Sequence, residues 1–125
     1  MLELGMDFKV VEAKWQKYWA ANASLWRAED GSGKIKKYIL VEFPYPSGSG
    51  LHVGHAFSFT GADIFARYRR MRGDNVLFPM GWDAFGLPTE NYAIKTKKKP
   101  QAVTKENIET FKAQMKKLAY SFDWS

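Results

Sequence analysis

The sequence contains no cysteine, which excludes a disulfide framework and a thiolate zinc site. The absence of cysteine agrees with a cytoplasmic protein, which is the location we expect. No apolar run approaches the roughly 20 residues that are needed to cross a bilayer, so we expect no membrane partner. The opening residues, MLELGMDFKVVEAKW, also lack the apolar core of a signal peptide. These absences argue against a secreted or membrane-spanning protein.

The composition is that of a small folded domain. Among the 125 residues, 46% are hydrophobic and 16% are aromatic, which is enough to bury a core. The net charge of +6 permits a polyanionic partner such as RNA or the phosphates of ATP. We interpret the basic run KTKKKP, residues 95–100, as a solvated lysine-rich surface.

Hydrophobic spacing predicts a helix near each end of the chain. The first covers residues 7–22, and its stripe comprises Val11, Trp15, Tyr18, Trp19 and Asn22. The second covers residues 105–119, with Thr104 as its N-cap. The apolar face of the second helix comprises Ile108, Phe111, Met115 and Leu118.

Residues 24–43 have the pattern of a β-hairpin. The arms are SLWRAE and KKYILVEF, and the turn is DGSGK, where glycine supplies a positive φ. The apolar run YILV, residues 38–41, is continuous rather than alternating, which predicts a strand that is buried on both faces.

A strand–helix–strand unit follows. The helix should begin at about His52 or Val53 and end at Arg72, with Gly73 as its C′ residue. Its apolar stripe comprises Phe57, Gly61, Ile64, Tyr68 and Met71. Asp63 lies off that stripe and is expected to be solvated. The second strand is NVLFPM, so the unit predicts two parallel strands with a right-handed connection.

His52 and His55 lie where the first strand leads into that helix. Ligands bind at this edge of open α/β sheets, and a helix N-terminus attracts anions. Imidazole donors suit a phosphate, and Gly54 lets a flat ring approach closely. Two alternatives remain: a metal site completed by residues such as Asp63 or Asp83, and a packing role. Neither a P-loop nor a dinucleotide fingerprint is present. The position of the two histidines at the start of a helix favours a phosphate ligand over these alternatives.

The loop after the second strand is rich in glycine, and Pro88 is predicted as the first residue of a further helix. Asp83 in this loop suits a cation of fixed position, with an Asx-turn or a helix cap as the alternative. Phe43 and Tyr45 either line a ligand site or only pack within their loop. Trp82 and Phe85 are expected to be structural supports.

Three motifs carry a resemblance to a known family. FPYPSG at 43–48, HVGH at 52–55 and GWDAFGLP at 81–88 are similar, in order and spacing, to those of the leucyl-tRNA synthetases, which are class I enzymes. NYAIKT at 91–96 and the closing SFDWS also fit. The resemblance implies an α/β fold in which residues 38–125 form the first half of a Rossmann-like parallel sheet. Residues 1–37 would contribute the preceding helix and hairpin.

The resemblance also implies a reaction and roles for particular residues. The family activates L-leucine with ATP and Mg²⁺ to leucyl-adenylate and transfers leucine to tRNA-Leu. His52 and His55 would contact the ATP phosphates and stabilise charge at the α-phosphorus, and Gly54 would lie under the adenine. The leucine site would comprise Phe43, Pro44, Tyr45 and Asp83, with Asp83 pairing with the ammonium group. No protein-bound metal is expected in this segment.

The sequence departs from the family pattern in two respects. It has no KMSKS motif, the family's second ATP-binding signature, and Glu42 stands where many members have an apolar residue. The alternative function is therefore a non-catalytic nucleotide- or RNA-binding module. Half of a doubly wound sheet also leaves an unpaired edge, so we expect the chain to self-associate or to bind a partner along that edge.

Overall fold

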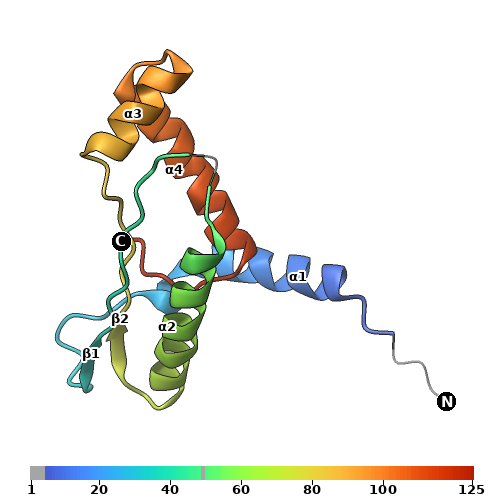
Figure 1. Cartoon of the computed structure of the whole chain (residues 1–125). Coiled ribbons are helices and arrows are strands. Elements are labelled where there is room, and N and C mark those ends of the chain that lie inside the picture. Colours follow the sequence, from blue (N-terminus) through green and yellow to red (C-terminus); the bar gives the residue numbers. More distant parts are fainter. Residues whose placement is uncertain (1–4, 49) are drawn as a thin grey trace.

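The structure is a computed structural model that describes residues 5–48 and 50–125. The described residues form an α/β arrangement of two parallel strands, four α-helices and one 3₁₀ helix, so the predicted α/β class is confirmed. In chain order the elements are α1 (Phe8–Ala21), η1 (Ala23–Trp26), β1 (Lys36–Tyr38), α2 (Val53–Met71), β2 (Asn75–Leu77), α3 (Leu87–Thr96) and α4 (Pro100–Lys117). The strands and α2 lie at one end, α3 and the start of α4 lie at the other, and α1 projects away from both (Figure 1).

The predicted strand–helix–strand unit is confirmed. Strands β1 and β2 pair in parallel with Lys37 opposite Val76, and α2 connects them. Helix α2 begins at Val53 and ends at Met71, and Gly73 follows with a φ of +88°. A left-handed residue at this position closes the helix, and glycine adopts it without a steric penalty.

The predicted hairpin is wrong, although its turn is right. Gly31 and Gly33 both have a φ of +69°, but the arm before them forms η1 and loop rather than a strand. That arm is held by more distant partners: the Ala28 N–H donates to Asp123 Oδ2 at 2.9 Å, and the Glu29 N–H donates to Asn75 Oδ1 at 2.9 Å. These bonds replace the ladder that a hairpin would supply.

The prediction that residues 38–41 are buried on both faces is also wrong. Tyr38 and Leu40 are 64% and 61% exposed, whereas Ile39 and Val41 pack against the core. The segment therefore alternates like a strand that is covered on one face only. The outer face, which carries Tyr38 and Leu40, is largely exposed.

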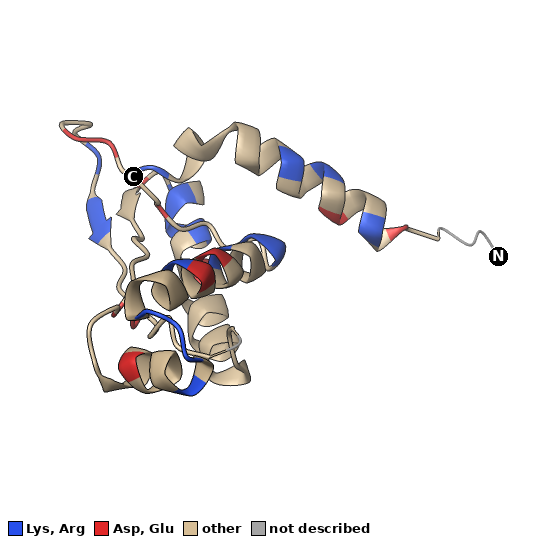
Figure 2. Ribbon diagram, turned by 90° about the horizontal axis from the view of Figure 1, so that it is seen from above, with Lys and Arg blue, Asp and Glu red and all other residues tan. Residues whose placement is uncertain are grey.

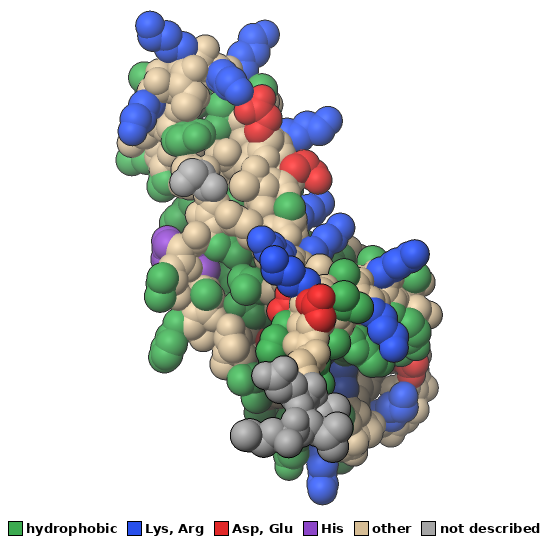
Figure 3. Space-filling view, turned by 90° about the vertical axis from the view of Figure 1, so that its right-hand side faces the viewer, with side chains coloured by type: hydrophobic (Ala, Val, Ile, Leu, Met, Phe, Trp, Pro, Cys, Tyr) green, Lys and Arg blue, Asp and Glu red, His purple; other side chains and the backbone are tan. Residues whose placement is uncertain are grey.

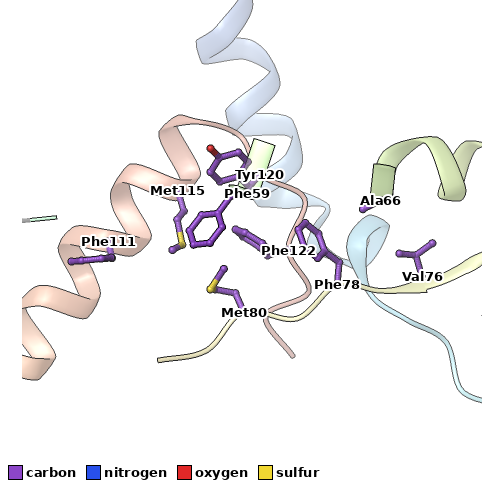
Figure 4. Close-up of a cluster of buried hydrophobic side chains, with 9 residues drawn as sticks. All are labelled: Phe59, Ala66, Val76, Phe78, Met80, Phe111, Met115, Tyr120 and Phe122. Atoms are coloured by element: carbon purple, nitrogen blue, oxygen red, sulfur yellow. The ribbon is translucent and has the colours of Figure 1, made fainter. Parts of the chain in front are cut away.

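The core joins α2, α4, the stretch from β2 to Met80, and the C-terminal stretch that carries Tyr120 and Phe122 (Figure 4). Phe122 lies at its centre, with its ring centroid 4.6 Å from Phe78 and 5.7 Å from Phe59. The buried cluster comprises Phe59, Ala66, Val76, Phe78, Met80, Phe111, Met115, Tyr120 and Phe122. The Asp123 N–H donates to the Phe78 oxygen at 2.7 Å, so the closing SFDWS extends the strand pairing beyond β2.

Helix α2 buries a different face from the one predicted. Phe57, Ile64 and Met71 are 84%, 64% and 80% exposed, and the buried residues are Phe59, Asp63 and Ala66. Asp63, expected to be solvated, is only 7% exposed. The core side of this helix therefore carries a carboxylate, while much of its apolar stripe faces outwards.

Asp63 is buried because both of its oxygens are paired. Oδ2 accepts from Arg67 Nε at 2.7 Å, one turn along the helix. Oδ1 accepts from the Ser121 N–H at 2.7 Å and also from the Ser121 hydroxyl. Arg70 Nη1 donates to the same hydroxyl oxygen at 2.8 Å, so one polar network joins α2 to the C-terminal segment. A buried carboxylate is tolerated only with such partners.

Helix α4 begins earlier than predicted. Pro100 is its first residue, and Thr104 lies inside the helix, where its hydroxyl donates to the Pro100 oxygen at 2.8 Å. Thr104 is therefore not the N-cap. Phe111 and Met115 are buried as expected, but Ile108 is half-buried and Leu118 is exposed. Helix α3 begins at Leu87, which places Pro88 at its second position.

Helix α1 is confirmed, but its predicted stripe is not buried. Asp7 caps the helix by accepting the Lys9 N–H at 3.0 Å, and no residue of α1 is buried. The helix contacts the rest of the chain near its end, where the Arg67 guanidinium lies 5.1 Å from the ring centroid of Trp19. The outer part of α1 therefore extends away from the core (Figure 1).

The predicted lysine-rich surface is confirmed. The four lysines of KTKKKP are all exposed, and they lie where α3 ends and α4 begins (Figure 2). Lys97 has a left-handed φ of +54° and forms the C-cap of α3, and Lys98 Nζ lies 2.6 Å from Glu106 Oε2. An exposed pair of this kind contributes at most about 1 kcal/mol to stability.

Candidate functional site

One pocket of about 1010 Å³ contains every residue that the family resemblance assigned to a site. Its wall comes from the segment after β1, the start of α2 and the loop after β2. The predicted residues in the wall are Phe43, Pro44, Tyr45, His52, Gly54, His55 and Asp83. Glu42, Ser58 and Trp82 also line it, and Ser58 was not predicted. The two histidines lie at the surface among hydrophobic side chains (Figure 3).

The two histidines cap α2 reciprocally. His52 is the N-cap residue: its N–H donates to Nδ1 of His55 at 3.2 Å, and the His55 N–H donates to Nδ1 of His52 at 3.4 Å. The rings stack with centroids 3.8 Å apart. Because Nδ1 of each ring accepts a backbone N–H, each neutral imidazole carries its proton on Nε2. Both residues can therefore offer a neutral Nε2–H donor to a ligand.

The surroundings keep His55 neutral. Burial is the main cause that lowers its pKa below the ordinary value of 6.5, and the neighbouring His52 lowers it further. Glu42 acts in the opposite direction through its negative charge. A positive charge on one of two stacked imidazoles disfavours a positive charge on the other. A ligand that accepts hydrogen bonds, such as a phosphate oxygen, fits this arrangement.

Two glycines make room for aromatic rings in the pocket. A Cβ on Gly54 would lie 2.9 Å from Cε1 of His52, and a Cβ on Gly81 would lie 2.7 Å from Cε2 of Phe43. Carbon atoms do not approach so closely without displacement. The ring that needs the space at Gly54 in this structure is therefore the imidazole of His52.

Asp83 reaches the pocket from the loop after β2. Its N–H donates to the oxygen of Pro44 at 3.2 Å, which joins two of the predicted segments. Asp83 is exposed, and the N-cap of α3 is Gly86, so Asp83 does not cap that helix. Pro44 is buried, whereas Phe43 and Tyr45 are 39% and 49% exposed. A carboxylate and two partly exposed aromatic rings thus face one space.

Trp82 is the structural support that the sequence predicted, but Phe85 is not. The Trp82 ring packs edge-on against Phe111, with centroids 5.9 Å apart, and Trp82 contacts the core. Phe85 is 95% exposed, because no described residue covers its part of the loop. Its prediction as a support is wrong.

The described residues contain no group of three or more His, Cys, Asp or Glu side chains that could hold a metal ion. None of the helices in residues 5–48 and 50–125 is both long and apolar enough to cross a membrane.

The family of class I tRNA synthetases (M) matches residues 37–124. The chain belongs to this family. It is 52% identical, over 119 residues, to a leucine–tRNA ligase of Prosthecochloris aestuarii (strain DSM 271 / SK 413), a match that covers 95% of the chain and 15% of the relative. The resemblance to leucyl-tRNA synthetases that three motifs indicated is thus confirmed.

A solved structure supports the same assignment. The synthetase chain resembles LeuRS in a crystal structure of the Agrobacterium radiobacter K84 agnB2 LeuRS–tRNA–LeuAMS ternary complex. The TM-score is 0.88 with 38% sequence identity, over 95% of this chain and 15% of that one. The chain therefore spans about 15% of the length of each of these two synthetases.

The contacts that α4 makes beside this candidate site were not predicted from the sequence. Asn107 and Gln114 form hydrogen bonds with Pro46 and Leu51, which lie on the segment that leads into α2. The sequence did contain a signal for these hydrogen bonds, because positions 107, 111 and 114 share one helix face at spacings of four and three. Two amides on an otherwise apolar face indicate buried polar partners.

Proposed function

We propose that this chain forms the first half of the Rossmann-like catalytic domain of a leucyl-tRNA synthetase. Residues 38–125 would form this half-domain, and residues 1–37 would lead into it. The observation that carries the proposal is that seven residues, chosen from three separate motifs, line one pocket. The pocket lies where α2 begins, at the edge where ligands bind in open α/β sheets.

ATP would bind with its phosphates at the N-terminus of α2. His52 and His55 would donate from Nε2–H to phosphate oxygens, and the backbone N–H groups of the first helical turn would add to the attraction. Gly54 would lie under the adenine. Mg²⁺ would arrive with the phosphates, because it is usually held by substrate phosphates together with one or two carboxylates.

The leucine carboxylate would attack the α-phosphorus of ATP, and pyrophosphate would leave. No covalent bond to the protein forms in this step. The residues of this chain would hold the two substrates in line and stabilise charge at the α-phosphate. In a full-length leucyl-tRNA synthetase that contains this segment, the leucyl group of the adenylate would then pass to tRNA-Leu.

The leucine site would be built by Phe43, Pro44, Tyr45 and Asp83. The aromatic rings and proline would contact the aliphatic side chain, and the Asp83 carboxylate would accept from the ammonium group. Glu42 lines the same pocket and adds a second negative charge near the amino acid. An apolar wall alone rejects a substrate shorter by one methylene only about 10- to 200-fold.

The test of this function is leucine-dependent exchange of pyrophosphate into ATP. The longer enzyme that contains this segment should exchange with leucine far faster than with valine. Exchange that does not depend on leucine would contradict the proposal. If the 125-residue chain binds ATP and the longer enzyme catalyses no exchange, the alternative of a nucleotide- or RNA-binding module holds.

Replacing Asp83 by alanine should weaken the use of leucine more than the use of ATP. A hydrogen bond to a charged group contributes about 1.5–3 kcal/mol, so the KM for leucine should rise roughly 10- to 100-fold. Asp30, an exposed carboxylate in the DGSGK turn, offers a control as Asp30→Ala. The measurement is pyrophosphate exchange as a function of each substrate. An unchanged leucine dependence would remove Asp83 from the site.

We also propose that the isolated chain self-associates. In the described residues β1 pairs only with β2, so the other edge of β1 has no strand partner, whereas the chain just after β2 bridges to Asp123. Helix α2 also carries exposed apolar side chains, including Phe57 at 84% and Met71 at 80% exposure. Analytical ultracentrifugation should show oligomers that dissociate on dilution, and Phe57→Glu with Met71→Glu should weaken them. A clean monomer from micromolar to millimolar concentration would contradict this.

A further inference from the structure

The segment before α2 is held from a helix that lies more than fifty residues further along the chain. We propose that Asn107 and Gln114 of α4 are positioning residues that fix this segment and so aim the imidazoles of His52 and His55. The inference rests on the proposed function, because the positioned groups are those assigned to ATP. It assigns a role in this site to a helix that carries none of the recognised motifs.

Asn107 pairs with the segment at Pro46. Asn107 is 8% exposed, and its Nδ2 donates to the Pro46 oxygen at 2.8 Å in a buried hydrogen bond. Pro46 is among the fully buried residues of the chain. A buried backbone oxygen without a donor is costly, so this bond ties the PYP sequence to α4.

Gln114 pairs with the segment at its other end. Its Oε1 accepts the N–H of Leu51 at 2.7 Å. Leu51 directly precedes His52, the N-cap of α2, so the bond sets where the cap begins. Gly50 has a φ of +134°, and a Cβ there would overlap the Gln114 amide. The backbone therefore approaches Gln114 closely at Gly50.

Phe111 lies between the two amides on the same helix face. It is 1% exposed, and its ring lies 6.2 Å from that of His55 in an edge-on contact. The same ring contacts Trp82, the neighbour of Asp83. One face of α4 thus contacts the segment at two points, one of the two histidines, and the loop that carries the proposed ammonium partner.

The polarity of the two hydrogen bonds makes the inference testable. Asn107 must donate and Gln114 must accept, because their partners are a carbonyl and an N–H. Exchanging an amide for a carboxylate removes the donor but keeps an acceptor. The same chemical change should therefore be harmful at position 107 and tolerated at position 114. A role in filling space alone would not distinguish the two positions.

The experiment measures single-turnover formation of leucyl-adenylate by the longer enzyme at saturating ATP and leucine. Misplacement of reacting groups by about 1 Å can cost roughly 100-fold, so Asn107→Asp and Gln114→Ala should slow the step by roughly 10- to 100-fold. Gln114→Glu should stay near the wild-type rate constant, and any repulsion of ATP should raise only its KM. Gln101→Ala, on an exposed part of α4, is the control.

Equal rate constants for Gln114→Ala and Gln114→Glu, or a wild-type rate constant for Asn107→Asp, would overturn the inference. If Asn107→Asp does not fold, the pair of variants at Gln114 decides. His52→Ala distinguishes this result from a failure of the proposed function. If His52→Ala slows the step and the amide variants do not, only the inference fails. If His52→Ala leaves the step unchanged, the proposed function fails.

Discussion

Replacing His52 or His55 by alanine should lower the rate constant for leucyl-adenylate formation by about 100- to 1,000-fold, the usual cost of removing one preorganised donor. Each neutral ring offers Nε2–H at the start of α2, and negative charge shifts at the α-phosphate as the transition state forms. ATP binding should weaken much less, because the interaction is strongest in the transition state. The measurement is single-turnover adenylate formation, with ATP affinity determined separately for the longer enzyme.

Asparagine should be milder than alanine at either position, because its amide is also a neutral donor. It can cap the helix as well, so it separates the loss of a donor from the loss of the ring. If the rate constant is unchanged and only the affinity for ATP falls, the histidines bind ATP in the ground state without stabilising the transition state.

Activity should survive chelation of transition metals once Mg²⁺ is restored. If it returned only with zinc, the metal alternative would be correct.

Replacing Asp63 by alanine should destabilise the chain by about 3–5 kcal/mol, the usual cost of breaking a buried ion pair by removing one partner. The change leaves the Ser121 N–H and hydroxyl without their Asp63 acceptor and removes the carboxylate that pairs with Arg67 Nε. Domains of this kind have about 5–15 kcal/mol of stability in total, so a large part would be lost. Urea unfolding of the chain measures the difference.

Asp63→Asn should cost less than Asp63→Ala, because an amide oxygen still accepts from Ser121. The matched control is Glu109→Ala on α4, which removes an exposed carboxylate that lies 3.7 Å from Lys112. Exposed pairs contribute about 0–1 kcal/mol, so the control should barely change the unfolding midpoint. Equal effects at Asp63 and Glu109 would show that burial of the Asp63 network does not stabilise the fold.

Much of the candidate site followed from the sequence because its chemistry is local. The two histidines are three residues apart, which lets each cap the other's backbone N–H. A strand–helix–strand pattern places the start of the helix at one edge of the sheet, and the loop after the second strand returns to that edge. The family resemblance assigned residues of the three motifs to one site, and the structure brings these residues to one pocket.

The hydrogen-bond partners of α4 could not be assigned in this way. Gln114 lies 63 positions from Leu51, and Asn107 lies 61 positions from Pro46. Nothing in the spacing of two amides says which distant carbonyl or N–H they meet. The same limit applies to the hairpin, whose first arm found its partners in Asn75 and Asp123 instead of the neighbouring strand.

The sequence alone determined the helices α1 and α2, the parallel strand pair, and the family, because caps, periodicity and motifs depend on residues close together in the chain. Only the tertiary structure decided which face of α2 is buried. Periodicity placed Phe57, Ile64 and Met71 inside, yet Asp63 is buried and they are exposed. The reason is a partner 58 residues away: Ser121 and Arg67 satisfy the carboxylate, and Phe122 then packs beside Phe59. A buried charge is acceptable only where the fold supplies its partners.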